Sequence, residues 1–394
     1  MSIYLDYAAA TYVRPEVKRA MDKYFSKEFG NPSSFNTIGL NAKNAVESSR
    51  EKIAKVAGCS PKEAIFTGSG TESINLAIKG VAFAMKNKGK HIITSKVEHH
   101  AVLNTCKYLE EKGFNITYLD VDKYGMVNSK DVEKAIKKDT ILITIIYANN
   151  EIGTINPISE ISRVARKHNI LFHTDACQAT GFLDINVNRL NVDLMTINSG
   201  KIYGPKGIGL LYIRKGTIIE PLIHGGGQEF GLRSGTENVP YIVGFAKALE
   251  LADKEKNKES KRLQRLRDKL IEKLLKIPKT ILNGHPQKRL PNNVNVTFLD
   301  IEGEALLLLL NEHGIYAATG SACASEKLEP SHVILAIGLP YEAAHGSIRF
   351  SLGKKTTKED INKVADVLPK LVENLRCISP VNVKMSTIRK LMKR

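Results

Sequence analysis

Between about residues 90 and 214, short apolar runs alternate with segments whose apolar positions recur at helical spacing. Buried strands are predicted at residues 91–94, 115–119, 140–147, 170–174, 193–197 and 208–213. Helices are predicted between them, for example at residues 101–112 and 158–168. Strands and helices that alternate in this way form a mainly parallel sheet with both faces covered. Ligands of such sheets bind beyond the carboxyl ends of the strands.

A second, smaller α/β unit is predicted in the C-terminal part of the chain. A long helical pattern at residues 239–276, heavily charged in its second half, leads into it. Its strands are expected at residues 293–298, 315–318 and 347–352, and its helices at 302–312, 330–336 and 358–375. We therefore predict a large domain of residues 15–255, a small domain of residues 1–14 and 256–380, and a basic tail at residues 381–394.

Composition narrows the class of protein. The 394 residues are 42% apolar and 25% charged, as expected of a globular protein with two lobes. The longest purely apolar stretch, residues 305–310, is too short to span a bilayer, and the first residues lack the pattern of a secretory signal. Five cysteines without regular spacing argue against a disulfide framework and against a metal site. We expect a cytoplasmic protein that needs no membrane.

The formal net charge of +17 has two interpretations. It reflects a lysine-rich composition, or it attracts an anionic partner such as tRNA or an acidic protein. Basic residues are spread along the chain, with concentrations at residues 254–279 and in the tail. Spread charge does not by itself make a nucleic-acid site, so direct binding of nucleic acid stays open.

The most informative chemistry lies at two strand ends. Asp175 closes one predicted strand, and Lys201 follows the next one. An aspartate that keeps a pyridine nitrogen protonated and a lysine that bonds to an aldehyde are what pyridoxal phosphate requires. Such a pair in isolation is common in loops, so other segments must agree with it.

Three further strand ends carry suitable groups. The glycine-rich segment that contains Gly70 and Thr71 leads into a helix and can bind a phosphate, although a capped turn explains it equally well. His99 can stack on a cofactor ring and move protons. Asn150 and Gln178 can donate to a phenolate oxygen, although asparagine is also common in turns.

The small lobe adds a cysteine and an arginine. Cys323 lies among small residues between a strand and a helix, where a thiolate nucleophile can work, although most cysteines are inert. Arg349 lies in the middle of a predicted strand, where a buried carboxylate would account for its charge. That carboxylate belongs either to a ligand or to the protein itself.

Together these segments resemble, from end to end, the cysteine desulfurases of pyridoxal-phosphate fold type I. The resemblance is carried by residues 4–9, 30–34, 67–75, 98–99, 149–153, 173–178, 201–209, 224–229, 233–236, 320–323 and 347–353. The segment at residues 324–330 resembles the subgroup associated with iron–sulfur cluster assembly. Such a fold has a large domain with a mainly parallel, seven-stranded type of sheet and a smaller α/β C-terminal domain.

The resemblance implies roles around the cofactor ring. Lys201 would hold pyridoxal 5'-phosphate, and Asp175 would pair with its ring nitrogen. His99 would stack on the ring and move protons. Asn150 and Gln178 would contact the phenolate oxygen, and Asn150 would also lie at the substrate.

It also implies roles at the phosphate and the substrate. Gly70 and Thr71 would bind the phosphate with help from Thr236 of the second subunit of a homodimer. Arg349 would hold the carboxylate of L-cysteine. Cys323 would attack the substrate sulfur and carry it as a persulfide while L-alanine is released. An iron–sulfur scaffold or a tRNA-thiolation enzyme would then accept the sulfur.

The chain departs from the family pattern just before the lysine. The family usually has Ser-x-His there, whereas this chain has Asn198 and Gly200 in those two positions. Asn198 can still donate a hydrogen bond to the phosphate, but Gly200 cannot replace an imidazole, so weaker cofactor retention is expected. Asn36 and Ala10 replace the usual His and Thr, which affects only the substrate pocket.

An aminotransferase, a selenocysteine lyase and a scaffold protein share parts of this pattern. An aminotransferase needs no thiol such as Cys323, whereas a selenocysteine lyase is separable only by relative turnover of the two substrates. From a different class, a weakly catalytic scaffold for sulfur-transfer partners would have no need for the whole set of reactive residues. The basic tail either docks a partner or is a solvated end.

Overall fold

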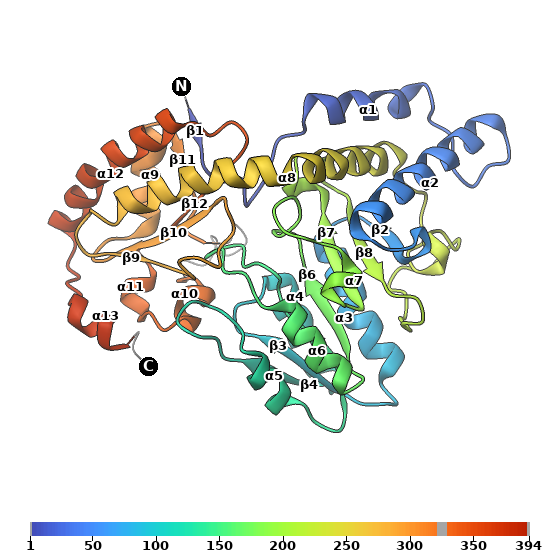
Figure 1. Cartoon of the computed structure of the whole chain (residues 1–394), viewed down its shortest axis with the longest axis horizontal. Helices are drawn as coiled ribbons and strands as arrows, with labels where there is room; N and C mark the ends of the chain where they lie inside the picture. The colour runs from blue at the N-terminus through green and yellow to red at the C-terminus, as the bar shows by residue number, and fades with distance from the viewer. Residues whose placement is uncertain (1, 321–328, 392–394) are drawn as a thin grey trace.

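The computed structural model describes residues 2–320 and 329–391 and has two lobes joined by one long helix (Figure 1). Cys323 lies outside the described residues. The large lobe is built on a seven-stranded sheet in the order β2-β8-β7-β6-β5-β3-β4. The strands are β2 (Ala64–Thr67), β3 (His91–Ser95), β4 (Asn115–Leu119), β5 (Thr140–Thr144), β6 (Leu171–Asp175), β7 (Leu194–Asn198) and β8 (Gly209–Ile213).

The sheet is mainly parallel, as the sequence predicted. Only β8 runs antiparallel to its neighbours β2 and β7. The strand predicted at residues 140–147 ends at Thr144, and the short strand β2 was not predicted. A four-residue strand that is buried throughout has no alternation of polar and apolar positions that could reveal it.

Helices cover both faces of the sheet because neighbouring strand residues point to opposite sides. Ile93 of β3 belongs to the core cluster that also contains buried residues of helices α1 (Pro15–Ser26), α2 (Thr37–Ala57) and α6 (Ile158–Lys167). Its neighbour Ile92 packs on the other face with α3 (Gly70–Met85) and α4 (His100–Glu111). Continuous apolar strands between two helical layers are what this parallel architecture requires.

The small lobe contains an antiparallel sheet in the order β12-β10-β9. Its strands are β9 (Thr280–Leu282), β10 (Asn293–Phe298) and β12 (Ser347–Ser351). The N-terminal strand β1 (Ile3–Tyr4) pairs in parallel with β11 (Ile315–Tyr316) of this lobe. Its helices are α9 (Gly303–Glu312), α10 (His332–Ala336), α11 (Tyr341–Ala344), α12 (Lys358–Ile378) and α13 (Met385–Leu391).

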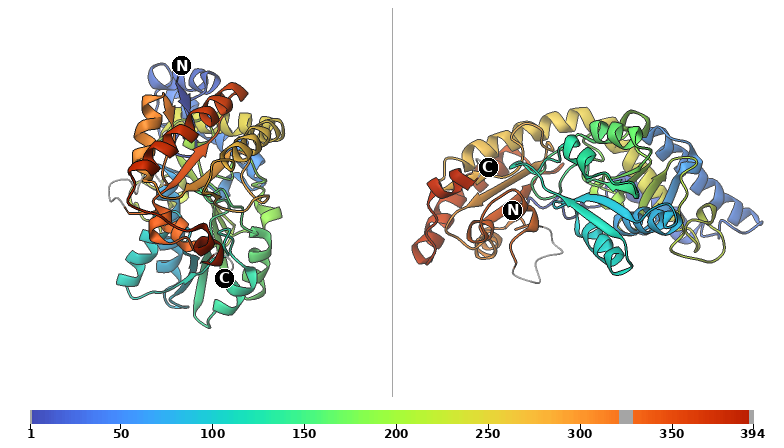
Figure 2. Two further views of the ribbon diagram at one scale, coloured as in Figure 1. Left: turned by 90° about the vertical axis from the view of Figure 1, so that its left-hand side faces the viewer. Right: turned by 90° about the horizontal axis from the view of Figure 1, so that it is seen from below.

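Helix α8 (Val239–Leu274) has 36 residues and runs through both lobes (Figure 2). Phe245 and Leu249 in its first half pack in the core of the large lobe. Leu263 and Leu270 in its second half pack in the core of the small lobe. The predicted boundary at residue 255 falls between these two groups. No helix of the described residues is both long and apolar enough to cross a membrane.

The C-terminal tail folds back onto the small lobe and also packs with residues of the large lobe. Ile388 of α13 is buried in a cluster with Val97, Ile152 and Val333. Just before this helix, the Val383 N–H donates to Asp300 Oδ1 over 2.6 Å. The described part of the tail therefore contributes to packing and is not only a solvated end.

Candidate active site

Four of the predicted site residues follow four adjacent strands. Lys201 follows β7, Asp175 ends β6, Asn150 follows β5 and His99 follows β3. These strands run parallel, so their carboxyl ends meet at one edge of the sheet. The charged groups of Asp175 and Lys201 are both close enough to His99 to shift the pKa of its ring. The structure thus brings the sequence-predicted set together.

Lys201 ends a short 3₁₀ helix, η2 (Ser199–Lys201), that turns the chain away from β7. Asn198 caps this helix, because its Oδ1 accepts a hydrogen bond from the Gly200 N–H over 2.8 Å. Lys201 Nζ donates to the carbonyl oxygens of Ala8 and Ala9 over 2.8 Å and 2.6 Å. Burial lowers the pKa of this amine. A lysine that loses its proton more readily is suited to bond to an aldehyde.

Asp175 is buried at the end of β6, and its Oδ1 accepts a hydrogen bond from the Cys177 N–H over 2.9 Å. The strand is held in place by His173, whose ring nitrogens contact Thr144 Oγ1 at 2.8 Å and Thr196 Oγ1 at 3.0 Å. Burial lowers the pKa of His173 to about 4, so its ring is neutral near pH 7. Asp175 is therefore held at the end of a strand on which the His173 ring carries no charge.

His99 caps the N-terminus of α4. Its Nδ1 accepts a hydrogen bond from the Ala101 N–H over 3.0 Å, which places the proton of the neutral ring on Nε2. Burial lowers the pKa of His99, and the nearby Asp175 carboxylate opposes this shift. Nε2 is consequently the nitrogen that can donate or take back a proton.

A cradle for a phosphate lies at the start of α3. Ser69 Oγ accepts the Glu72 N–H over 3.1 Å, and Gly70 and Thr71 form the first residues of the helix. A Cβ added to Gly70 would lie 3.0 Å from Cys177 Sγ and 3.2 Å from Asn198 Nδ2. A side chain at Gly70 would crowd these atoms beside the helix N-terminus, where an anion is stabilised. The residues present therefore fit a phosphate-bearing cofactor, and Asn198 keeps an N–H₂ group close to it.

The small lobe supplies Arg349 from the middle of β12. Its side chain is 2% exposed. Nη1 donates to the Asn150 carbonyl oxygen over 3.1 Å, and Nη2 pairs with Asp6 Oδ1 at 2.7 Å. A protein carboxylate, that of Asp6, therefore already pairs with Arg349.

Gln178 lies beside the N-terminal segment, whereas Thr236 lies at the surface. Gln178 Nε2 donates to the Ala8 carbonyl oxygen over 2.9 Å, which leaves one further N–H for a ligand. Thr236 is exposed and lines a surface cavity together with Gly68 and Arg233. It follows the short helix η3 (Glu229–Gly231).

Sequence reasoning missed two carboxylates at the site. Asp6 pairs with Arg349, and Glu98 precedes His99 with its own carboxyl buried. Glu98 Oε1 accepts hydrogen bonds from the Ser95 hydroxyl and the Ile146 N–H, over 2.6 Å and 3.0 Å. Burial raises the pKa of Glu98 to about 8. Both residues belong to segments noted for their resemblance, but nothing in their spacing indicated a contact with the site.

Comparison with known proteins gives one family. Residues 3–364 match the model of the aminotransferase class-V family. The chain is 57% identical to the cysteine desulfurase IscS of Methanosarcina thermophila over 383 residues, which cover 97% of this chain and 95% of the relative. It is also 57% identical to the cysteine desulfurase IscS of Dictyoglomus turgidum, with 96% of each chain covered.

Solved structures agree with these relatives. A NifS-like protein superimposes with a TM-score of 0.89 at 40% identity, and the match covers 95% of this chain and 100% of the other. A structure described as SspA in complex with cysteine gives a TM-score of 0.80 at 41% identity, with 89% of this chain and 99% of the other covered.

Proposed function

The chain belongs to the aminotransferase class-V family and is a pyridoxal-phosphate-dependent cysteine desulfurase within it, and we propose how its own residues carry out the reaction. The observation that carries the proposal is the meeting of Lys201, Asp175 and His99 at one sheet edge, opposite Arg349 of the other lobe. One lobe thereby provides the cofactor site, and the other provides the carboxylate site.

When bound, the cofactor withdraws electrons from the carbon that carries the substrate amine. Lys201 would hold it covalently, and Asp175 would keep its ring nitrogen protonated. Gly70, Thr71 and Asn198 would bind its phosphate, as their convergence at the start of α3 supports. His99 would cover the ring and move protons through Nε2, because Nδ1 is occupied by the Ala101 N–H.

Arg349 would bind the carboxylate of L-cysteine, and the Asn150 carbonyl would orient the guanidinium. Cys323, as a thiolate, would attack the substrate sulfur. A sulfur–sulfur bond forms and the carbon–sulfur bond breaks, with its electron pair left on the carbon. A proton delivered to that carbon completes L-alanine, and the sulfur stays on Cys323 as a persulfide.

The residue assignments are tested by mapping two covalent bonds. Reduction of the holoenzyme with borohydride should fix the cofactor on the peptide that contains Lys201. Alkylation after exposure to L-cysteine should find the extra sulfur on the peptide that contains Cys323. A Cys323→Ser variant should keep the first label and lose the second. A label on a different lysine, or a persulfide that survives in Cys323→Ser, would refute the assignment concerned.

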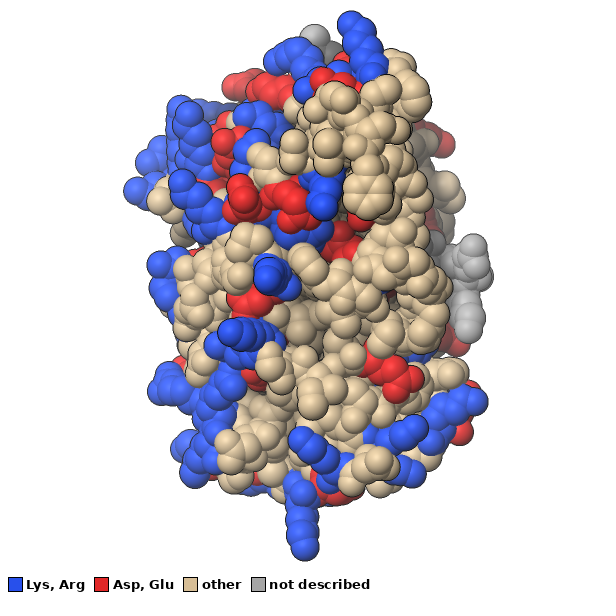
Figure 3. Space-filling view, turned by 90° about the vertical axis from the view of Figure 1, so that its right-hand side faces the viewer, with Lys and Arg blue, Asp and Glu red and all other residues tan. Residues whose placement is uncertain are grey.

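We propose that the enzyme works as a homodimer. Several large apolar side chains of the large lobe are exposed, namely Phe25, Phe29, Phe35, Ile38, Leu40, Ile218 and Phe230. Figure 3 shows that the middle of the end face beyond α2 carries mainly uncharged side chains, with Lys and Arg gathered toward its margins. An apolar face with a charged rim is typical of an interface between subunits. Thr236, exposed in one chain, would then reach the phosphate of the other.

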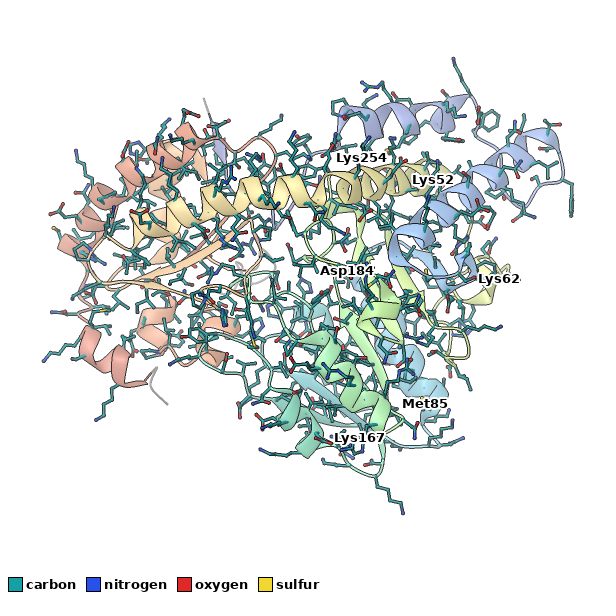
Figure 4. The ribbon with its side chains drawn as sticks, in the orientation of Figure 1. Lys52, Lys62, Met85, Lys167, Asp184 and Lys254 are labelled. Atoms are coloured by element: carbon teal, nitrogen blue, oxygen red, sulfur yellow. The ribbon has the colours of Figure 1, made fainter. Side chains whose placement is uncertain are left out.

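We also propose that the sulfur goes to a protein of iron–sulfur cluster assembly or of tRNA thiolation. The net charge of +17 favours an acidic acceptor. Lys52 of α2 and Lys254 of α8, labelled in Figure 4, lie on two helices that pack together. Both lysines are close enough to Glu250 to interact with its carboxylate, so basic side chains of the two helices gather in one region. The cysteines of the described residues, Cys59, Cys106, Cys177 and Cys377, are free thiols, which supports a reducing compartment such as the cytoplasm.

A further inference from the structure

The N-terminal segment connects the two halves of the site. Asp6 follows β1 and lies in a bridge with Ser351 at the end of β12. The carbonyl oxygens of Ala8 and Ala9 accept hydrogen bonds from Lys201. A few residues thus contact both the carboxylate-binding strand and the cofactor lysine.

Within the part of the chain that the structure describes, Asp6 is the one anionic side chain that contacts Arg349. The Oδ1–Nη2 distance is 2.7 Å, and the side chains are 19% and 2% exposed. Within the same described residues, Arg349 Nε is buried without a hydrogen-bond partner. The guanidinium is therefore neutralised on one edge and still has an unused donor.

A buried guanidinium without an anion is costly, and a small anion can relieve that cost. If no protein carboxylate were present, any small anion would be attracted to Arg349. With Asp6 in place, a ligand carboxylate must displace it or share the guanidinium with a like charge close by. The charges of Asp6 and Arg349 also both reach the Lys201 amine, where Arg349 lowers its pKa and Asp6 raises it. The three groups therefore interact electrostatically.

We propose that Asp6 competes with ligand carboxylates for Arg349 and so sets how strongly a carboxylate ligand must bind elsewhere in the site. The proposal rests on the proposed role of Arg349 in binding the substrate carboxylate. Asp6 lowers the affinity for every carboxylate ligand and keeps the empty site from filling with small anions. L-cysteine succeeds because its amine and thiol add contacts that a simple anion lacks.

The test measures ligand binding to the holoenzyme by the change in cofactor absorbance. An Asp6→Asn variant should bind L-alanine about tenfold more tightly, the size of one charge-assisted hydrogen bond. L-Alaninamide, which has no carboxylate, should bind as it does to the unmodified enzyme. Acetate should become a competitor of L-alanine. Asp22→Asn, which removes an exposed ion pair with Lys18, is the matched control and should change nothing.

Unchanged or weaker binding of L-alanine in a folded Asp6→Asn protein would overturn the proposal. If that variant does not fold, Asp6→Ala provides a second route, because acetate should raise its melting temperature by filling the vacated place beside Arg349. No stabilisation by acetate would also count against the proposal. An Arg349→Gln variant tests the role of Arg349 separately from that of Asp6. If this variant binds L-alanine normally, the proposed role of Arg349 is wrong. If it binds L-alanine weakly, the role of Arg349 stands, and the Asp6→Asn result decides the claim about Asp6.

Discussion

At the scale of single residues, Gly200 is the departure with the clearest consequence. It stands where the family usually has a histidine at the cofactor phosphate. An added Cβ would meet Asn198 Oδ1 at 3.4 Å and Lys206 Cγ at 3.5 Å, which are ordinary contacts. The backbone thus tolerates a side chain here, so a histidine can be introduced without a change in the fold.

We therefore predict that Gly200→His retains pyridoxal phosphate better than the natural chain. The dissociation constant should fall about fivefold, as expected for one added hydrogen bond. Equilibrium dialysis followed by absorbance measures it. Gly200→Ala is the control and should leave the constant unchanged. Equal or weaker retention in the histidine variant would show that Asn198 already satisfies the phosphate.

Glu98 gives a prediction for pH. Its pKa is raised to about 8 by burial, so the folded protein holds this proton over a range in which the unfolded chain releases it. The free energy of unfolding should therefore fall as pH rises toward 8, by about 1.4 kcal/mol per unit of pH from this group. Glu98→Gln keeps an oxygen for the Ser95 and Ile146 donors and cannot ionise.

Denaturant unfolding at several pH values, with the stability of Glu98→Gln subtracted from that of the natural chain, isolates this contribution. The difference should grow in favour of the variant as pH rises. A difference that does not depend on pH would mean that Glu98 is already ionised in the folded protein.

The sequence was sufficient to predict those site residues that lie at the ends of strands. Asp175 and Lys201 were predicted in this way because a strand end is visible in the pattern of apolar residues. Asp6 was not, because its contact joins positions 6 and 349, and no local spacing records such a pairing. Glu98 was overlooked because its burial depends on packing between several elements.

At the scale of elements, the parallel strands were predictable and the short antiparallel ones were not. β2 and β9 have four and three residues, too few for a periodic pattern. The short helix η3, which precedes Thr236, was equally hidden, because an ion pair holds it. Arg50 of α2 contacts Glu229 at 2.8 Å, and each side chain is 2% exposed.

We predict that Glu229→Gln destabilises the fold by about 3 kcal/mol, because it removes the buried partner of Arg50 and leaves this charge only the half-exposed Glu47 at 3.3 Å. Glu229 Oε2 also accepts the Phe66 N–H over 2.7 Å, so the change loosens η3 against β2. Thermal and denaturant unfolding measure the loss. Glu250→Gln, which removes a half-exposed pair with Lys247, should cost no more than about 0.5 kcal/mol. A similar small cost at Glu229 would contradict the account of this pair.

At the scale of the whole molecule, two lobes and one long helix place Arg349 opposite the cofactor residues. The proposed dimer adds a second chain to the same site. Phe35, which is 97% exposed, is the most exposed of the large apolar side chains in the described structure. A charge at this position would oppose the burial of the proposed apolar face.

Phe35→Asp should therefore shift the protein toward a monomer and weaken retention of the cofactor, since Thr236 of the second chain would be lost. Analytical ultracentrifugation and absorbance report the two effects. Ile378→Asp, at a side chain of the small lobe that is 79% exposed, is the control and should remain a dimer. A dimeric Phe35→Asp protein would place the interface elsewhere.

The central claim is that this sheet edge holds pyridoxal phosphate and that Cys323 takes sulfur from cysteine there. The most direct measurement is the absorption spectrum of the purified protein before and after L-cysteine, with L-alanine assayed in the same sample. We predict a cofactor band that changes with cysteine in both the natural chain and Cys323→Ser, and repeated formation of alanine only in the natural chain. No bound cofactor after pyridoxal phosphate is supplied, or equal alanine formation by both proteins, would contradict the account.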